Sequence, residues 1–433
     1  MSFTTVAGRT PIDTDVPAIR NDSKSFRRGA FGPMTLRRVE DMEVAGKRLL
    51  VRADLNVPVE EGRVTDATRI DRFAAGMKPL LDRGARLVIL THYGRPDPAA
   101  PDPALSVENL GPALSGALGV PVRFAASCAG RDAVALSAQL ADGEAMLCEN
   151  LRFDPGETHN DPTFAAGLAK LGDIYVNDAF SCAHRAHAST AAIAALLPAA
   201  AGPLLTEELR ALNDTLEAPR RPSVAIVGGA KVSTKIAVLK NLVRKLDSVI
   251  VGGGMANTFF VADDIPVGRS LCEPDHVGTV HEIRRAAAEA GCRIVLPVDI
   301  VTASELSHGA RATVRDLDAC PADDLILDAG PRSRERFNAL LDGAATLLWN
   351  GPPGAFEYRQ FADATIAIAR HAADLTRTGA LRSVAGGGDT VAALNAAGVA
   401  EDFSYVSTAG GAFLEWLEGR TLPGIAALER AAR

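Results

Sequence analysis

The sequence has none of the features that indicate secretion, membrane insertion or a disulfide framework. No apolar run is long enough to span a bilayer, and residues 1–33 contain no apolar segment of the kind found in a secretory signal. The 6 cysteines are widely scattered and include no C-x-x-C pair. This pattern favours reduced thiols in a cytoplasmic protein over disulfides or a zinc site.

An excess of positive charge is also missing. The formal net charge is −7, which gives no reason to expect nucleic acid or an anionic membrane as a partner. Two common nucleotide-binding patterns, G-x-x-x-x-G-K-[ST] and G-x-G-x-x-G, are absent. The P-loop and the dinucleotide-binding fingerprint are therefore excluded.

The chain has 433 residues, which suggests about two or three domains. Residues 1–33 show little periodicity, and we expect a flexible extension with Met34 as an alternative start. Acidic residues in this stretch (Asp13, Asp15 and Asp22) argue against a transit peptide. From Lys47 onward, strand-like runs alternate with helical ones in two series, which predicts an α/β fold with mainly parallel sheets.

Each strand-like run of the first series is followed at once by polar or cationic residues. The predicted strands are Lys47–Arg52, Arg86–Thr91, Glu144–Cys148 and Asp173–Val176. Ligands of open α/β sheets bind beyond the carboxyl ends of the strands. The side chains expected to share one crevice there are Arg69, His92, Arg95, Arg152 and Arg185, with Arg69 placed in a loop. Because guanidinium groups bind phosphate and carboxylate, this crevice suits a small polyanion, while Asp54 and Asn56 suit a substrate hydroxyl.

Simpler interpretations exist for these residues. A single arginine is more often an exposed, structurally neutral charge, by roughly 4 to 1. The joint placement of several arginines after strands reverses that preference. His184 and His187 are three residues apart, but no third ligand at suitable spacing accompanies them, so a metal site is not predicted.

Glycine clusters follow the predicted strands of the second series. These strands are Ser223–Val227, Ser248–Val251, Ala345–Trp349, Ala380–Val384 and Ser404–Val406. Glycines at several strand ends indicate a flat ligand whose phosphates lie close to the backbone. Lys231 and Lys235 are four residues apart around a helix start, so both are expected to face that ligand.

The segment Ala385–Thr390 is expected to join a strand to a helix. Its three glycines let a ligand approach, and the helix N-terminus favours a phosphate. Asp389 is suited to holding Mg²⁺ on that phosphate. A tight turn with a good N-cap is the alternative interpretation of this segment alone.

Taken together, the motifs resemble those of the phosphoglycerate kinase family. They are Arg52-Ala-Asp-Leu-Asn-Val-Pro58, His92-Tyr-Gly-Arg-Pro96, Glu149-Asn-Leu-Arg-Phe153, Asn177-Asp-Ala-Phe180, His184-Arg-Ala-His187, Gly228-Gly-Ala-Lys231 with Lys235, Trp349-Asn-Gly-Pro352 with Glu357, and Gly386-Gly-Gly-Asp-Thr390. The resemblance runs from about Met34 to the C-terminus. It implies two Rossmann-like three-layer α/β domains joined by a hinge. Their expected bounds are 34–205 and 206–410, with 411–433 packing back on the first domain.

The resemblance also implies the site. The N-terminal domain is expected to bind 3-phosphoglycerate or 1,3-bisphosphoglycerate through Asp54, Asn56, Arg69, His92, Arg95, Arg152 and Arg185. The C-terminal domain is expected to bind ATP or ADP through Lys231, Lys235, Gly253, Asn350, Pro352, Glu357, Gly386, Gly387, Gly388, Asp389 and Thr390. Mg²⁺ is expected on Asp389. Tyr93 and Ala409 depart from the family's usual Leu and Gly, and Ala409 is expected to influence the hinge because alanine needs negative φ.

The implied reaction is reversible phosphoryl transfer between Mg-ATP and the carboxylate of 3-phosphoglycerate, as in glycolysis, within a cytoplasmic monomer. A carboxylate is already ionised at pH 7, so no general base is required. Arg69, Lys231 and the helix N-terminus at Gly388 are expected to stabilise the transition state. Two alternatives remain: another carboxylate kinase on a similar scaffold, and a catalytically silent paralogue that binds nucleotide.

Overall fold

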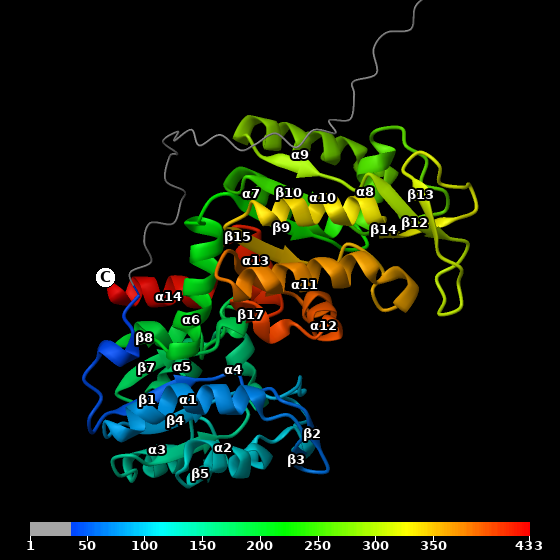
Figure 1. The fold of residues 1–433 in the computed structure, drawn as a ribbon. Helices are drawn as coiled ribbons and strands as arrows, with labels where there is room; N and C mark the ends of the chain where they lie inside the picture. Colours follow the sequence, from blue (N-terminus) through cyan, green and yellow to red (C-terminus); the bar gives the residue numbers. More distant parts are fainter. Residues whose placement is uncertain (1–35) are drawn as a thin grey trace, which may run out of the picture. The chain divides into compact units, whose positions relative to one another are not determined.

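The computed structural model describes residues 36–433 (Figure 1). The predicted flexible extension over residues 1–33 and the alternative start at Met34 lie outside this described part. No helix between residues 36 and 433 is long and apolar enough to cross a membrane. Within this range, two parallel six-stranded sheets flanked by helices confirm the predicted α/β class.

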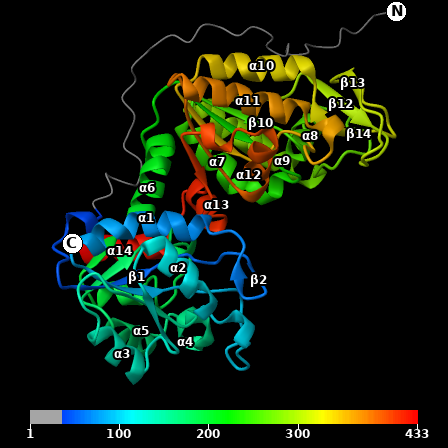
Figure 2. The ribbon, with the colours of Figure 1, turned by 60° about the horizontal axis from the view of Figure 1, so that its bottom comes forward.

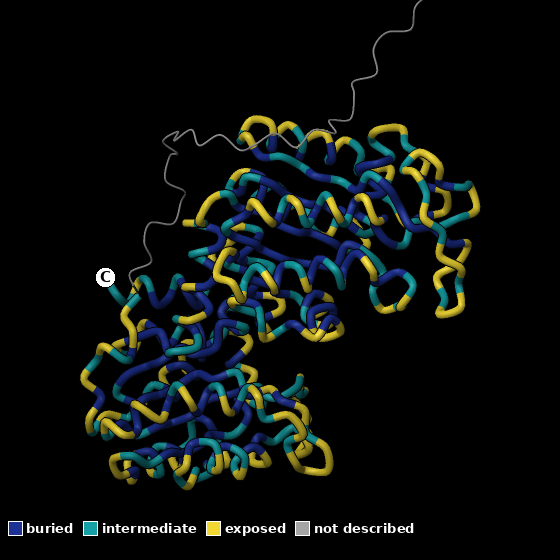
Figure 3. The backbone as a smooth tube through the Cα atoms, in the orientation of Figure 1, coloured by how far each residue is buried: buried dark blue, intermediate teal, exposed yellow. Residues whose placement is uncertain are grey.

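The first sheet has the strand order β5-β6-β4-β1-β7-β8, and every neighbouring pair is parallel. Its strands are β1 (Arg48–Arg52), β4 (Arg86–Leu90), β5 (Val122–Ala125), β6 (Ala145–Cys148), β7 (Ile174–Asn177) and β8 (Ala199–Ala201). The four central strands are almost continuously buried (Figure 3). A parallel sheet covered on both faces requires such apolar runs, and this is why those four strands were predictable.

Helices of the first half cover this sheet. They are α1 (Thr68–Asp82), α2 (Gly111–Leu118), α3 (Arg131–Ala138), α4 (Pro155–Thr158) and α5 (Pro162–Ala169), and a short hairpin pairs β2 (Val59–Glu60) with β3 (Arg63–Val64). On α1 the buried residues Ile70, Phe73 and Met77 recur at helical spacing and pack in one core with strand residues such as Leu49 and Ile89. This packing fixes α1, and its first turn, against the sheet.

The second sheet has the order β11-β10-β9-β15-β16-β17 and is also parallel throughout. Its strands are β9 (Ser223–Val227), β10 (Ser248–Val251), β11 (Arg293–Val295), β15 (Thr346–Asn350), β16 (Arg382–Gly386) and β17 (Tyr405–Ser407). The helices of this half are α7 (Ile236–Lys245), α8 (Gly254–Val261), α9 (Val277–Ala290), α10 (Pro331–Asp342), α11 (Asp363–Arg377) and α12 (Gly388–Ala397). One core joins α10, α11 and α12 to buried strand residues, among them Ile226, Leu347 and Trp349.

A separate antiparallel sheet of three strands adjoins this half and was not predicted. It pairs β12 (Asp299–Ala303) with β13 (Thr313–Asp316) on one side and β14 (Leu325–Ala329) on the other. Strand β13 alternates intermediate and exposed residues, so it carries little of the apolar signal that marks the parallel strands.

Helix α6 (Pro203–Leu212) connects the two halves and continues into a π-helical turn (Asn213–Glu217). Its N-terminus is capped by Asp178, whose Oδ1 accepts the N–H groups of Leu204 (2.7 Å) and Leu205 (3.2 Å). A side chain at position 202 would clash with this cap, since a Cβ on Gly202 would lie 2.3 Å from Asp178 Oδ1.

The chain ends in α13 (Gly411–Leu417) and α14 (Pro423–Ala432). Helix α14 contacts β8 and the 3₁₀ helix Ala192–Ala195, which both belong to the first half (Figures 1 and 2). The last residues of the chain therefore lie against elements that are more than 200 residues earlier in the sequence.

Candidate functional site

The predicted site residues of the first half gather at the carboxyl edge of its sheet. Asp54 and Asn56 follow β1, His92 and Arg95 follow β4, Arg152 lies in the 3₁₀ helix after β6 (Leu151–Phe153), and Arg185 follows β7. Arg69 differs from the prediction, because it lies in the first turn of α1 rather than in a loop. The helix therefore gives Arg69 a fixed position.

A cavity of about 440 Å³ lies among the arginines. Its lining consists of Arg95, Pro96, Pro98, Arg152, Thr158, Arg185 and His187. Within residues 36–433, none of the three arginines forms an ion pair with a carboxylate. Burial and the charge of Arg185 lower the pKa of Arg152, because the like charges repel. Three unneutralised guanidinium groups around one cavity suit a multiply charged anion.

Arg69 lines a second cavity together with Asp54 and Ser181, where it belongs to a polar cluster. Its Nη1 donates to Asp54 Oδ2 at 2.8 Å and to the Asn56 carbonyl at 3.4 Å. The Ser181 hydroxyl also donates to Asp54 Oδ2. Asn56 Oδ1 accepts the Gly94 N–H at 3.1 Å, so it links the loops after β1 and β4. The guanidinium of Arg69 is only partly buried, which leaves it accessible to a ligand.

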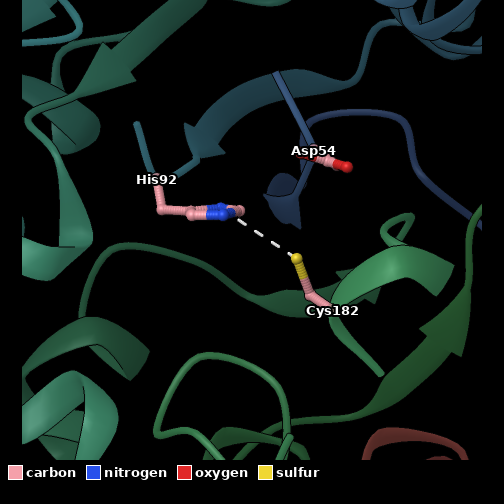
Figure 4. Close-up of side chains that lie close together, drawn as sticks. All are labelled: Asp54, His92 and Cys182. Carbon is pink, nitrogen blue, oxygen red and sulfur yellow. Dashed lines mark hydrogen bonds between the residues drawn. The ribbon is translucent and has the colours of Figure 1, made fainter. Parts of the chain in front are cut away.

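Asp54, His92 and Cys182 form the closest group of metal-ligating side chains in the described part of the chain (Figure 4). Their donor atoms lie within 4.8 Å of one another. Arg52 Nη2, however, is 3.1 Å from His92 Nδ1 and 3.5 Å from Cys182 Sγ. A cation placed between these donors would meet that guanidinium and the Arg69 charge on Asp54, so the group does not suit a metal.

The glycine turns of the second half pack closely on one another. A Cβ on Gly228 would lie 1.9 Å from the Pro352 carbonyl oxygen, and one on Gly254 would lie 2.4 Å from the Ala230 carbonyl oxygen. The Gly253 N–H donates to the Pro353 carbonyl at 2.8 Å. Several of these glycines are therefore required by backbone packing as well as by any ligand.

The two predicted lysines differ in their surroundings. Lys235 Nζ donates to the carbonyls of Gly228 (2.8 Å) and Asn350 (2.9 Å) and to Asn350 Oδ1 (2.6 Å). Burial lowers the pKa of Lys235 to about 8, while the nearby Asp389 raises it. Lys231 is exposed. Lys235 thus holds strand ends together, and Lys231 is free to meet a ligand.

The segment at the start of α12 is held by two further contacts. Asn350 Nδ2 donates to the Gly386 carbonyl at 2.8 Å, and Thr390 Oγ1 accepts the Gly351 N–H at 2.7 Å. Gly387 has φ +98°, a conformation that favours glycine. Gly388 and Asp389 are exposed, and a Cβ on Gly388 would meet nothing within 4 Å. The helix N-terminus is therefore open where the prediction placed a phosphate.

Pro352 is buried and Glu357 is exposed, both beyond β15. Ala409 is buried and is absent from the residues with positive φ, whereas Gly410 beside it has φ +55°. Ala409 is therefore unstrained, because Gly410 and not Ala409 adopts the left-handed conformation. Tyr93 packs against the first core.

Sequence reasoning missed several residues of the first half. Arg52, Glu157 and Ser189 form a buried network behind His92, and His187, considered only as a metal ligand, lines the cavity. Arg52 gave one usable signal, since a charged residue ending a buried strand needs an internal partner. Nothing local in the sequence identifies that partner.

Fold and site together define a class: an α/β protein of two parallel sheets that presents arginines at the strand ends of one sheet and glycine turns with an open helix N-terminus at those of the other. The family model "Phosphoglycerate kinase" matches residues 39–420. The chain belongs to the phosphoglycerate kinase family, as its motifs predicted.

Several relatives and solved structures support this assignment. The chain is 55% identical to a phosphoglycerate kinase of Sinorhizobium medicae over 398 residues, covering 92% of this chain and 100% of that protein. It is 57% identical to one of Methylobacterium radiotolerans over 383 residues, covering 88% and 96%. The structure of phosphoglycerate kinase from Coxiella burnetii matches with a TM-score of 0.85 and 41% identity, covering 92% and 100%. That from Pyrococcus horikoshii matches with a TM-score of 0.74 and 30% identity, covering 92% and 99%.

Proposed function

We propose that this protein transfers a phosphoryl group reversibly between Mg-ATP and the carboxylate of 3-phosphoglycerate, giving 1,3-bisphosphoglycerate and Mg-ADP. The observation that carries the proposal is the cavity lined by Arg95, Arg152 and Arg185, with which no carboxylate of residues 36–433 forms an ion pair. A substrate with a phosphate and a carboxylate supplies the negative charge that these guanidinium groups lack. The family membership is consistent with this acceptor.

In this proposal the phosphate of 3-phosphoglycerate binds the three arginines. The reacting carboxylate lies toward Arg69, and His92, Asp54 and Asn56 contact the remaining oxygens of the substrate. Arg69 stands in the first turn of α1, and the cavity arginines follow β4, β6 and β7 at the same sheet edge, so in this proposal one small molecule reaches both. Asp54 is already the partner of Arg69, so it also orients that guanidinium.

ATP or ADP is assigned to the glycine turns of the second half. Lys231 and the N–H groups at Gly388 meet the phosphates, Glu357 meets the ribose, and the Gly253 turn lies by the adenine. Gly386, Gly387 and Thr390 shape the turn before α12, which Asn350 holds through the Gly386 carbonyl and Lys235 holds through Asn350. Asn350 and Pro352 lie beside the nucleotide in this proposal. Lys235 Nζ already donates to three protein oxygens, so it can contact a phosphate only if the phosphate displaces one of them. The predicted contact between Lys235 and a phosphate therefore requires the side chain to rearrange.

Mg²⁺ fits the residues present at the start of α12. The Asp389 carboxylate is exposed, and within residues 36–433 it forms no ion pair with a lysine or arginine. One hard oxygen ligand from the protein is typical of a Mg²⁺ that takes its others from phosphates and water. When bound, the ion neutralises phosphate charge.

In this reaction the protein has to align the two substrates and stabilise the charge on the transferred phosphoryl group. The attacking carboxylate is ionised at pH 7, so no side chain must remove a proton. His92 could not serve as a base near neutrality, since burial and the charge of Arg52 lower its pKa to about 2. Arg69 on one side and Lys231 with the α12 N-terminus on the other stabilise the charge on the moving phosphoryl group.

We also propose that residues 34–205 and 206–410 act as two domains, with 411–433 packed on the first, and that they close on each other around a hinge. Closure brings the two substrates together and excludes water. Small-angle scattering tests this point: the radius of gyration should decrease when both substrates are bound. A radius that stays constant contradicts closure.

The anion cavity yields the first test by mutation. We expect Arg185→Ala to raise the KM for 3-phosphoglycerate by roughly tenfold to a hundredfold, because a hydrogen bond to a charged group contributes about 1.5–3 kcal/mol. The KM for ATP should change less than about twofold, since Arg185 lies in the other half. Steady-state kinetics with each substrate varied in turn measures both constants.

Arg86→Ala is the matched control. Arg86 begins β4 at the opposite edge of the same sheet, and its Nε forms an ion pair with Asp142 at 2.8 Å. This variant should leave both KM values unchanged. Equal effects of the two substitutions would remove the cavity from the proposed substrate site.

A further inference from the structure

Arg52 is a buried cation that forms no direct ion pair with any carboxylate of residues 36–433. It ends β1, is 1% exposed, and is surrounded by neutral hydrogen-bond partners. Its Nε donates to Ser189 Oγ at 2.9 Å, Nη1 donates to the Ala53 carbonyl, and Nη2 lies 3.1 Å from His92 Nδ1. Burying a guanidinium group costs free energy unless hydrogen bonds and an opposite charge compensate for the lost hydration.

The compensating charge is Glu157 on α4, which reaches Arg52 through Ser189. The Glu157 side chain is fully buried, and its two oxygens accept the Ser189 hydroxyl (2.7 Å) and the Ser189 N–H (3.0 Å). Tyr175 on β7 fixes the same residue, since its hydroxyl donates to the Ser189 carbonyl at 2.7 Å. A continuous chain of contacts therefore runs from Glu157 through Ser189 and Arg52 to His92.

This series of contacts determines which ring nitrogen of His92 carries the proton. A guanidinium group offers only donors, so the contact between Arg52 Nη2 and His92 Nδ1 requires Nδ1 to be the acceptor. The imidazole must then be neutral and carry its proton on Nε2. Burial and the Arg52, Arg152 and Arg185 charges keep the pKa of His92 at about 2, far below its ordinary value.

The other ring nitrogen is left for a ligand. Within residues 36–433 no side chain or backbone group forms a hydrogen bond with His92 Nε2, and this atom is not among the buried polar atoms that lack a partner. Nε2–H is thus a donor that solvent can reach, in a loop shared with Arg95.

We propose that Arg52, anchored by Ser189 and Glu157, is a positioning residue that holds His92 as its neutral Nε2–H tautomer and so presents a hydrogen-bond donor to an oxygen of 3-phosphoglycerate. The substrate named here rests on the function proposed above. The opposite tautomer would turn a lone pair toward an anion, which repels it. A neutral donor also gives the site a directional contact whose strength does not change across physiological pH.

The charged and titratable groups around His92 support this assignment. Arg52, Arg152, Arg185 and His187 all oppose a positive charge on the ring. Asp54 and Cys182 lie close by, but Asp54 is paired with Arg69, and burial raises the pKa of the Cys182 thiol, so it stays protonated. The protonated Cys182 thiol lies 4.0 Å from His92 Nδ1 and is a weaker second donor to it, so it favours the same tautomer as Arg52 (Figure 4).

The test uses the full chain labelled with ¹⁵N-histidine, and the His92 signals are assigned by their loss in His92→Asn. Long-range ¹H–¹⁵N spectra distinguish a protonated ring nitrogen from an unprotonated one. In the ligand-free protein we expect an unprotonated Nδ1, a protonated Nε2 and no titration between pH 5.5 and 8.5. A protonated Nδ1, or titration in that range, would overturn the proposal.

Variants then test the role of Arg52. Arg52→Gln should let His92 populate both tautomers and should raise the KM for 3-phosphoglycerate about tenfold, with kcat changed less than about threefold. Arg52→Lys keeps the charge and should restore part of the KM. Ser189→Ala keeps Arg52 but removes its anchor, and it tests the network if Arg52→Gln does not fold. Variants with the wild-type spectrum and wild-type KM would refute the positioning role.

The outcomes separate the two proposals. The tautomer is read without any substrate, so it holds or fails independently of the reaction. Suppose that the His92 spectrum is as expected and that 3-phosphoglycerate supports turnover. If saturating 3-phosphoglycerate then leaves the His92 Nε2 signal unchanged, the contact between His92 and the substrate is refuted. A protein with that spectrum but no turnover contradicts the function instead.

Discussion

Arg69→Ala is expected to lower kcat by roughly two or more orders of magnitude, the usual loss when one preorganised stabiliser of transition-state charge is removed. The structure gives Arg69 the geometry for this role. It stands in the first turn of α1, is oriented by Asp54 at 2.8 Å, and remains partly exposed. Its removal should affect kcat more than either KM, because the charge it meets develops during transfer.

Two further variants make this test specific. Arg69→Lys keeps a positive charge but loses the planar fork, so an intermediate kcat is expected. Arg285→Ala removes an exposed arginine of α9 and should leave kcat unchanged. A kcat of Arg69→Ala within a few-fold of the unmodified protein would eliminate Arg69 as a transition-state stabiliser.

Gly228→Ala is expected to lower the free energy of unfolding by about 3 kcal/mol, at the upper end of the usual cost of overpacking. The added Cβ would lie 1.9 Å from the Pro352 carbonyl oxygen and 2.7 Å from the Gly351 carbonyl oxygen. Both are backbone atoms, which cannot rotate away as a side chain could. The shift they require also moves the Gly228 carbonyl, an acceptor of Lys235, so nucleotide affinity should fall with stability.

Urea unfolding followed by tryptophan fluorescence measures this effect, since Trp349 is buried on β15 and pairs with Ile226, two residues before Gly228. Gly278→Ala is the matched control: Gly278 lies in α9, and a Cβ there meets nothing within 4 Å. That variant should be as stable as the unmodified protein or slightly more stable. If both alanines have equal effects, close backbone packing is not the reason for Gly228.

The part of the fold that could be predicted follows from burial. Strands such as β1, β4 and β9 are covered on both faces, and their apolar runs are visible in the sequence. Strand β8 is Ala199–Ala201, and alanine has little preference for strands, so no local signal marked it. Strand β13 lies at the edge of its sheet beside β12 and is half exposed, so its sequence also lacks the apolar pattern that would predict a strand.

The same division holds for the site. Residues after strands could be placed together because all parallel strands end at one edge, as with His92 and Arg152. The hydrogen bonds that hold the site residues in place could not be predicted, because the two partners of each bond are distant in sequence. Lys235 and Asn350 are 115 residues apart, and Arg52 and Ser189 are 137 apart. Such pairings arise from packing, which local sequence does not encode.

The most direct test of the account is ADP formation from Mg-ATP with and without 3-phosphoglycerate, coupled to a reductase that consumes the acyl phosphate. We predict turnover that requires 3-phosphoglycerate and collapses in Arg69→Ala. Absence of turnover while ATP still binds would contradict the account. The arginine-lined cavity would then need a different anion, or the protein would be a nucleotide-binding paralogue without this activity.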